Sequence, residues 1–177
     1  MEDSNFIILL DQIPQEGLER NLDIEDPQGA GFELAVAQEG PMRVKARFTR
    51  HGDKVLVRGT VEVTVGLNCS RCLEEFSLDL KSDLETYLEE GGDSTPEADQ
   101  ELSPEELDFR PLHDGAVDLR ELVAEQVHLA LPVSALCSEG CRGLCPKCGL
   151  DLNQEGCSCL GEESDPRWEA LKKLKIP

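Results

Sequence analysis

The run CSEGCRGLCPKCGLDLNQEGCSC, residues 137–159, constrains the folding of this chain more than any other part of its sequence. It contains six of the eight cysteines, and they lie among Gly, Pro, Asn and Asp residues that favour turns. Six thiols in such a run make a poor hydrophobic core, because few large apolar side chains accompany them. We therefore interpret these cysteines as metal ligands or as bridges.

The eight cysteines form four pairs, which suits two tetrahedral sites of four sulfurs each. The pairs are Cys69 with Cys72, Cys137 with Cys141, Cys145 with Cys148, and Cys157 with Cys159. A gap of two residues lets one tight turn direct both sulfurs at one ion, and Gly149 lets the backbone fold closely around them. We expect Cys145, Cys148, Cys157 and Cys159 to form a zinc-ribbon-like site, and Cys69, Cys72, Cys137 and Cys141 to form a second one.

The expected cofactor is Zn²⁺, as one or two structural ions, because four thiolates suit zinc and leave no open position for water or a substrate. A swapped pairing of the cysteines, a single occupied site with spare thiols, and iron–sulfur clusters remain alternatives. Disulfides are less favoured, because thiols stay reduced inside cells. A thioredoxin-like redox pair would need its C-x-x-C motif at the start of a helix in a βαβ unit, and neither motif here has that setting.

The N-terminal sequence points to a cytoplasmic protein without a membrane segment. It opens MEDSNFIILLDQIPQEGLER, with acids where a signal peptide has lysines, and its apolar run is too short for a membrane span. The 37 acidic and 17 basic residues give a formal charge of −20, which opposes non-specific binding of nucleic acid. Any contact with RNA must therefore be local.

Residues 42–69 predict a long β-hairpin that turns at His51, Gly52 and Asp53. Apolar side chains alternate with polar ones on both sides of the turn, as strands require. The expected inward-facing residues are Val44, Ala46, Phe48, Val55, Val57, Val61, Val63, Val65 and Leu67. Gly59 is a candidate β-bulge.

The hairpin also carries six of the seventeen basic residues, with Asp53 as the single acid among them. These residues are Arg43, Lys45, Arg47, Arg50, Lys54 and Arg58. From spacing alone, an ordinary solvated face is slightly favoured over an RNA-binding face on the sheet.

The remaining elements complete a predicted α+β fold, an antiparallel β-sheet with a packed helix. Residues 76–88 favour a strand or a strand followed by a helix, and the acidic residues 89–110 favour a mobile loop. A helix over 118–131 would be capped by Asp118 and ended by Pro132. A short helix would follow at 165–175, with Trp168 as an apolar anchor. We divide the chain into an α+β domain, 1–136, and a cysteine-rich metal-binding segment with the final helix, 137–177.

The sequence contains no motif of a known catalytic site. It lacks GxSxG, HExxH and a Gly-rich phosphate loop, and no cysteine has an obvious histidine partner. We therefore expect a protein that is not an enzyme and has no small-molecule substrate.

Three separated motifs resemble those of the YceD-type large ribosomal RNA subunit accumulation proteins. They are VRGTVEVTVGLNCSRCLEEF at 57–76, CRGLCPKCGLDLN at 141–153 and DPRWEALKKL at 165–174, while the first forty residues add little. Cys69 and Cys72 match the most characteristic pair of that family, and the later cysteines match a subset of its members.

The resemblance implies a role in the accumulation or processing of 23S-type ribosomal RNA, and hence in ribosome biogenesis. Its implied partners are ribosomal RNA or a large-subunit ribosomal protein. The resemblance makes RNA contact through the basic hairpin residues the leading hypothesis. The alternatives are an acidic adaptor that holds a basic ribosomal protein and, less favoured, a thiol-redox protein.

Overall fold

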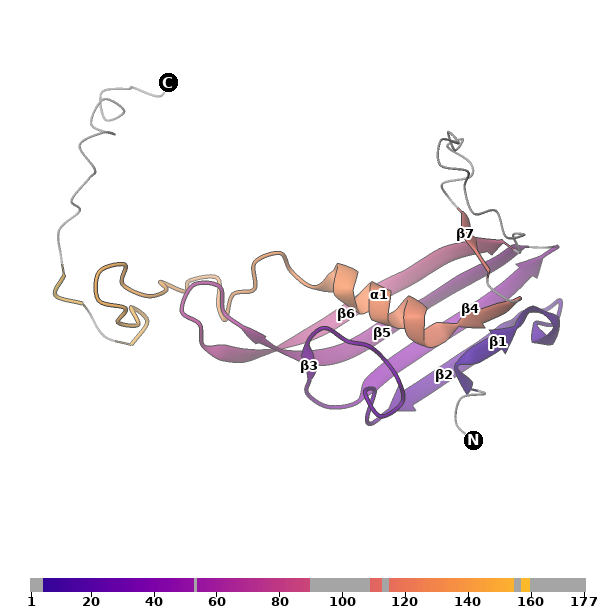
Figure 1. Cartoon of the computed structure of the whole chain (residues 1–177), viewed down its shortest axis with the longest axis horizontal. Helices are drawn as coiled ribbons and strands as arrows, with labels where there is room; N and C mark the ends of the chain where they lie inside the picture. The colour runs from indigo at the N-terminus through magenta and orange to yellow at the C-terminus, as the bar shows by residue number, and fades with distance from the viewer. Residues whose placement is uncertain (1–4, 53, 90–108, 113–114, 155–156, 160–177) are drawn as a thin grey trace, which may run out of the picture.

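A six-stranded sheet forms the centre of the computed structural model, which describes residues 5–52, 54–89, 109–112, 115–154 and 157–159 (Figure 1). Its order is β2-β4-β5-β6-β7, with β3 also paired to β5. The strands are β2 (Leu18–Ile24), β3 (Ala37–Gln38), β4 (Met42–His51), β5 (Lys54–Asn68), β6 (Glu75–Glu89) and β7 (Phe109–Pro111). All pairs are antiparallel except β6 with β7. The antiparallel sheet expected from the sequence is therefore present.

The hairpin of β4 and β5 is confirmed, and Gly52 at its turn has a φ of 70°, which favours glycine. Its register runs without interruption from Arg43 opposite Glu62 to His51 opposite Lys54, so the predicted bulge at Gly59 is wrong. Gly59 is instead a point of close approach. A Cβ at this position would lie 2.0 Å from the backbone oxygen of Lys45, which only glycine avoids.

The segment after the hairpin is a strand along its whole length. β6 pairs with β5 over 15 residues, from Glu75 opposite Asn68 to Glu89 opposite Lys54. The side chains of Leu84 and Leu88 are buried on the core face. Of the two predicted readings, the strand is correct and the strand-to-helix change is not. The turn between β5 and β6 carries Cys69 and Cys72.

Helix α1 (Leu119–Ala130) begins at its predicted cap, where the Asp118 carboxylate accepts a hydrogen bond from the Arg120 amide at 2.9 Å. Its apolar stripe is buried, and Gln126 donates a hydrogen bond to the Ser82 hydroxyl of β6 at 2.7 Å. The helix therefore packs against the sheet as expected. No helix among the described residues is long and apolar enough to cross a membrane.

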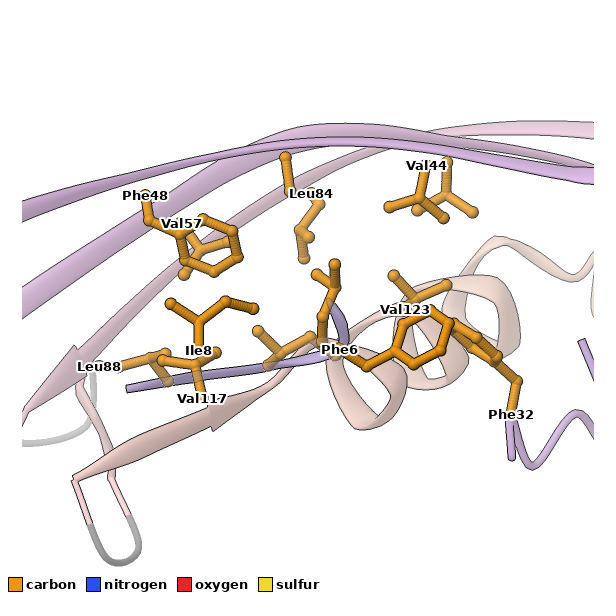
Figure 2. Close-up of a cluster of buried hydrophobic side chains, with 14 of the residues drawn as sticks. Phe6, Ile8, Phe32, Val44, Phe48, Val57, Leu84, Leu88, Val117 and Val123 are labelled. Atoms are coloured by element: carbon orange, nitrogen blue, oxygen red, sulfur yellow. The ribbon is translucent and has the colours of Figure 1, made fainter. Parts of the chain in front are cut away.

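The core lies between the inner face of the sheet and a layer made by α1 and a second small sheet. That sheet pairs β1 (Ile7–Leu9) with β8 (Ala116–Asp118), and a 3-10 turn, η2 (Leu10–Gln12), follows β1. Figure 2 shows Phe48 and Val57 of the large sheet facing Ile8 of β1. The first forty residues, which add little to the family resemblance, thus contribute buried residues to the core: Phe6, Ile8, Leu10, Ile13, Ile24 and Phe32.

Two predicted segments lie mainly outside the described residues. Within the predicted acidic loop 89–110, Glu89 ends β6 and Phe109 begins β7, while 90–108 are not described. The predicted C-terminal helix at 165–175, with Trp168, is also outside the described part of the chain.

Candidate metal centres

The structure brings the sulfurs of the eight cysteines into two groups of four. The first centre consists of Cys69, Cys72, Cys137 and Cys141, and the second centre of Cys145, Cys148, Cys157 and Cys159. Within each group the Sγ atoms all lie within 4.8 Å of one another. This is the grouping that the sequence analysis favoured over a swapped pairing.

The first centre joins the end of the sheet to the chain that follows α1. Its Sγ atoms lie 3.7 Å apart between Cys69 and Cys141, and 3.6 Å apart between Cys72 and Cys137. Cys69 is fully buried, and the sulfurs pack with the partly buried Phe76, Leu136 and Leu144. The centre is therefore a small second core, made largely of cysteine.

Backbone hydrogen bonds fix the two sides of the first centre against each other. The Ser70 amide donates to the Ala135 oxygen at 2.8 Å, and the Leu144 amide donates to the Arg71 oxygen at 3.1 Å. The Arg71 guanidinium donates to the Cys141 oxygen at 2.7 Å. The turn at 69–72 and the later cysteines are thus held together by more than their sulfurs.

The second centre lies farther from the sheet than the first (Figure 1), and its cysteines are more exposed to solvent. Its Sγ atoms lie 3.3 Å apart between Cys145 and Cys157, and 3.4 Å apart between Cys148 and Cys157. Cys145 is buried, whereas Cys148 and Cys159 are exposed. An ion here would be shielded less than one in the first centre.

The C-x-x-C turns of the two centres have the same local geometry. In the second centre the Gly149 amide donates to the Cys145 oxygen at 2.8 Å, with a φ of 74°. In the first, the Leu73 amide donates to the Cys69 oxygen at 2.9 Å, with a φ of 63°. Left-handed backbone is unfavourable for leucine, so the sequence signals the second turn through Gly149 but gives no such signal for the first.

The pKa values of the thiols differ sharply within each centre. Backbone hydrogen bonds from Cys137 and Cys72 lower the pKa of Cys69 to about 6. A backbone hydrogen bond from Glu74 acts to lower the pKa of Cys72, but burial and the neighbouring cysteine sulfurs outweigh it and raise that pKa to about 12. The first thiolate therefore forms readily, and it opposes ionisation of its neighbours. A bound cation is what would let all four ionise together.

The same asymmetry recurs in the second centre. Backbone hydrogen bonds from Cys148 and Lys147 lower the pKa of Cys145 to about 6. For Cys157 a backbone hydrogen bond from Cys159 acts in the lowering direction, but the other three sulfurs raise its pKa to about 12. Both centres thus combine one thiol that ionises readily with others that need a positive charge nearby to ionise.

The spacing of the sulfurs suits one metal ion in each centre. Zinc–sulfur bonds of about 2.3 Å in a tetrahedron place the sulfurs about 3.8 Å apart. Two sulfur–sulfur distances in each centre, 3.3 to 3.7 Å, are close to this value, and all four sulfurs of a centre lie within 4.8 Å of one another. A multi-iron cluster would need more room, because its irons and bridging sulfides lie between the thiolates. Either cysteine group could therefore hold a single ion.

The predicted basic residues do not all share one face of the sheet. Arg43, Lys45, Arg47, Lys54 and Arg58 lie on the outer face, away from the core. Arg50 lies on the core side of β4, where it donates to the Leu10 oxygen at 3.3 Å and pairs with Asp11 at 3.7 Å. Arg50 is an even number of residues away from the buried Val44 and Phe48 in β4. Because side chains alternate between the two faces of a strand, it lies on the same face as they do. Its assignment to the outer face is corrected.

Carboxylates from neighbouring strands pair with most of these outer basic residues. The ion pairs are Arg43 with Asp23 at 3.8 Å and with Glu62 at 3.4 Å, Arg47 with Glu19 at 3.0 Å, Arg58 with Glu85 at 2.8 Å, and Lys54 with Glu89 at 3.4 Å. All these carboxylates lie outside the basic run in the sequence. The outer hairpin face is therefore of mixed charge, which the sequence between residues 43 and 58 could not reveal.

Comparison with known proteins gives a family match over residues 57–175, to the model described as Large ribosomal RNA subunit accumulation protein YceD. An uncharacterized protein of Mycobacterium tuberculosis is 30% identical over 158 residues, which cover 87% of this chain and 72% of that protein. The chloroplastic YCED homolog 1 of Arabidopsis thaliana is 26% identical over 156 residues, covering 76% of this chain and 49% of that protein.

The Zea mays homolog of the same name is 28% identical over 142 residues, covering 67% of this chain and 48% of that protein. The chain thus spans about half the length of these plant relatives. No solved structure matches it. The family model covers most of the chain, including all eight cysteines, and the chain belongs to the family of YceD large ribosomal RNA subunit accumulation proteins.

Proposed function

We propose that this protein supports the accumulation of large-subunit ribosomal RNA as a non-enzymatic binding factor, with two structural Zn²⁺ ions in its cysteine-rich part. The family match is the observation that supports a role in this pathway, because it spans β6, α1 and both groups of cysteines. The role is one of binding because the chain has no recognisable catalytic motif.

The donor set supports zinc as the ion. Each centre offers four cysteine sulfurs within 4.8 Å of one another. Sulfur ligands favour zinc over harder cations such as Mg²⁺ and Ca²⁺. When bound, the ion would supply positive charge that neutralises the thiolates and fixes the loops between them. Four protein ligands leave no position for a water or a substrate, so the ions would be structural.

Direct contact with ribosomal RNA is proposed for the outer hairpin face, through Arg43, Lys45, Arg47, Lys54 and Arg58. Four of these five residues are ion-paired on the surface. Exposed pairs contribute only about 0.2–1 kcal/mol each, so phosphates could replace the carboxylates. The −20 charge of the whole chain would restrict the RNA to this face.

The second candidate is an adaptor whose acidic surface holds a basic large-subunit ribosomal protein. The mixed charge of the hairpin face and the excess of acids over the whole chain favour it. It predicts partners that survive complete digestion of RNA, whereas direct RNA contact predicts that they are lost.

Charge reversal on the hairpin tests RNA contact. A Lys45→Glu, Arg47→Glu, Arg58→Glu variant should lose RNA binding and flatten its salt dependence. Arg50→Glu is the control for the single variant Arg47→Glu, because both make the same change of charge on one strand of the hairpin, but Arg50 lies on the core side. Equal RNA binding by the triple variant and the wild type would remove this contact surface.

The pathway itself is tested in cells depleted of the protein. The ratio of large-subunit to small-subunit ribosomal RNA should fall, and the wild-type gene should restore it. A ratio that does not change on depletion would refute the proposed function.

Elemental analysis of anaerobically purified protein should find two zinc ions per chain, and the eight thiols should react slowly until zinc is released.

A further inference from the structure

We propose that Asn153 couples the two metal centres, so that an ion bound in the second centre strengthens binding of an ion in the first. The inference rests on the zinc sites of the proposed function and goes beyond them. Asn153 belongs in sequence to the loop between the ligands Cys148 and Cys157 of the second centre. Its side chain, however, contacts a ligand of the first.

The contact is a hydrogen bond to sulfur. Nδ2 of Asn153 lies 3.4 Å from Sγ of Cys141 and donates to it, while Oδ1 of Asn153 accepts from the Arg142 amide at 2.8 Å. Both side-chain ends of Asn153 are thus used on the segment that carries Cys141. Hydrogen bonds to ionised groups are the stronger class, so this bond would stabilise the charged form of a coordinating sulfur.

A short two-stranded bridge positions Asn153 opposite Cys141. Leu144 pairs with Asp151 in antiparallel fashion, and the Leu152 amide donates to the Gly143 oxygen at 2.9 Å. Asp151 also accepts from the backbone amide of Asn153 at 2.9 Å and from its side-chain amide at 2.8 Å. The rotamer of Asn153 is therefore set by contacts within this bridge, and it keeps the side chain directed at the first centre.

The second ion would control whether this bridge forms. Its ligands Cys145 and Cys148 lie on one side of Asn153 in the sequence, and Cys157 and Cys159 lie on the other. Closing that loop with an ion removes much of the conformational freedom of the loop. Asn153 is then preorganised for Cys141, and the first centre binds its ion without having to order the loop itself.

Electrostatics act in the opposite direction. Each zinc ion with four thiolates carries a charge of about −2, so two loaded centres repel each other through solvent. Two ligands of the second centre, Cys148 and Cys159, are exposed, however, and repulsion between exposed charges is screened by salt. We therefore expect preorganisation to win and the coupling to be positive, about tenfold, which is within the usual range for linked sites. Because the coupling free energy is the same in both directions, an ion in the first centre should strengthen binding in the second by the same factor.

The test is a double-mutant cycle on the full chain. The second centre is disabled with Cys148→Ser and Cys159→Ser, the link is removed with Asn153→Ala, and both changes are combined. The affinity of the first centre for Zn²⁺ is measured by competition with a chromophoric chelator. Gln154→Ala is the matched control, because it removes the side-chain amide of the neighbouring residue, which is exposed.

In the chain that keeps Asn153, we expect disabling the second centre to lower the affinity of the first centre for Zn²⁺ about tenfold. Asn153→Ala alone should weaken it by a similar factor, and the combined variant should be little worse than either. Gln154→Ala should have no effect. Equal losses on disabling the second centre with and without Asn153, or no loss at all, would overturn the coupling.

A spectroscopic reading separates a loss of the link from a loss of the fold. With ¹¹³Cd²⁺ in place of zinc, Asn153→Ala should shift the resonance of the first centre, because a hydrogen bond to one of its sulfurs is removed. An unchanged resonance would count against the inference. A wild-type chain that binds no ion would refute the zinc sites themselves, whereas two ions that bind independently would refute only the coupling.

Discussion

Gly59 is the position in the central strand at which the structure predicts the largest cost from adding a single methyl group. It lies opposite Ala46 in the middle of the β4–β5 ladder. A Cβ at Gly59 would lie 2.0 Å from the backbone oxygen of Lys45, well inside the 3.4 Å at which ordinary contact begins. The obstructing atom is backbone, so it can move only if the paired strands move apart.

The cost of Gly59→Ala follows from that geometry. Forcing extra atoms into a packed site costs about 1–3 kcal/mol, and each ladder hydrogen bond lost as the strands separate costs about 1 kcal/mol more. Replacing glycine by alanine also restricts the unfolded chain, which stabilises the fold by about 0.4–1 kcal/mol. We expect the free energy of unfolding to fall by about 2–3 kcal/mol.

Gly66→Ala on the same strand is the matched control. Its added Cβ would meet the side-chain carboxylate of Glu39 at 2.7 Å, and that flexible end can swing away. The change should therefore be close to neutral, within about 0.5 kcal/mol. Urea unfolding of the metal-loaded variants, followed by far-UV circular dichroism, measures both. If Gly59→Ala is as stable as Gly66→Ala, the close approach at Gly59 is refuted.

Three further changes test the core, the helix cap and the metal centres. Phe48→Ala should cost about 3–5 kcal/mol in urea unfolding, because the side chain is fully buried. Asp118→Ala should cost about 1 kcal/mol through loss of the cap. Burial acts to raise the pKa of Asp118, but hydrogen bonds from Arg120 outweigh it and lower that pKa. The contribution of the cap to stability is therefore fully present above the pKa that Asp118 has in the unfolded chain. It is lost as the pH falls through the pKa of Asp118 in the folded protein. Cys72→Ser should destabilise the protein more than Cys148→Ser in thermal melts, because Cys72 is buried and Cys148 is exposed.

Local patterns in the sequence were sufficient for several parts of the fold. Alternation predicts the hairpin because one face of the sheet is buried and the other is solvated. Asp118 and Pro132 mark the helix because caps and breakers act through nearby backbone groups. A similar rule predicts which cysteines form a pair, since two ligands from one tight turn approach the same ion, but the way in which the pairs combine is shown only by the structure.

Features that depend on distant segments could not be predicted in this way. The ion pairs of the hairpin join Arg47 to Glu19 of β2 and Arg58 to Glu85 of β6, and only the strand order shows which carboxylates are adjacent. The strand β1 and its buried Ile8 were missed for a different reason: a strand of three residues is too short to show a clear alternation of apolar and polar side chains. Gly59 was misread because a bulge and a close approach both call for glycine.

We expect the outer hairpin face and the cysteine-rich part to depend on metal to very different extents, so chelation can show which of them carries the proposed RNA contact. The outer hairpin face is held by the large core, including Phe48 and Val57, and needs no ion. The first centre has only a few apolar side chains around its sulfurs. If the proposed zinc ions are bound, the cysteine-rich part should lose its structure when they are removed. We expect protein treated with a strong chelator to keep its β-sheet circular dichroism and its RNA binding. Loss of RNA binding with the sheet intact would place the contact in the cysteine-rich part instead of on the hairpin face.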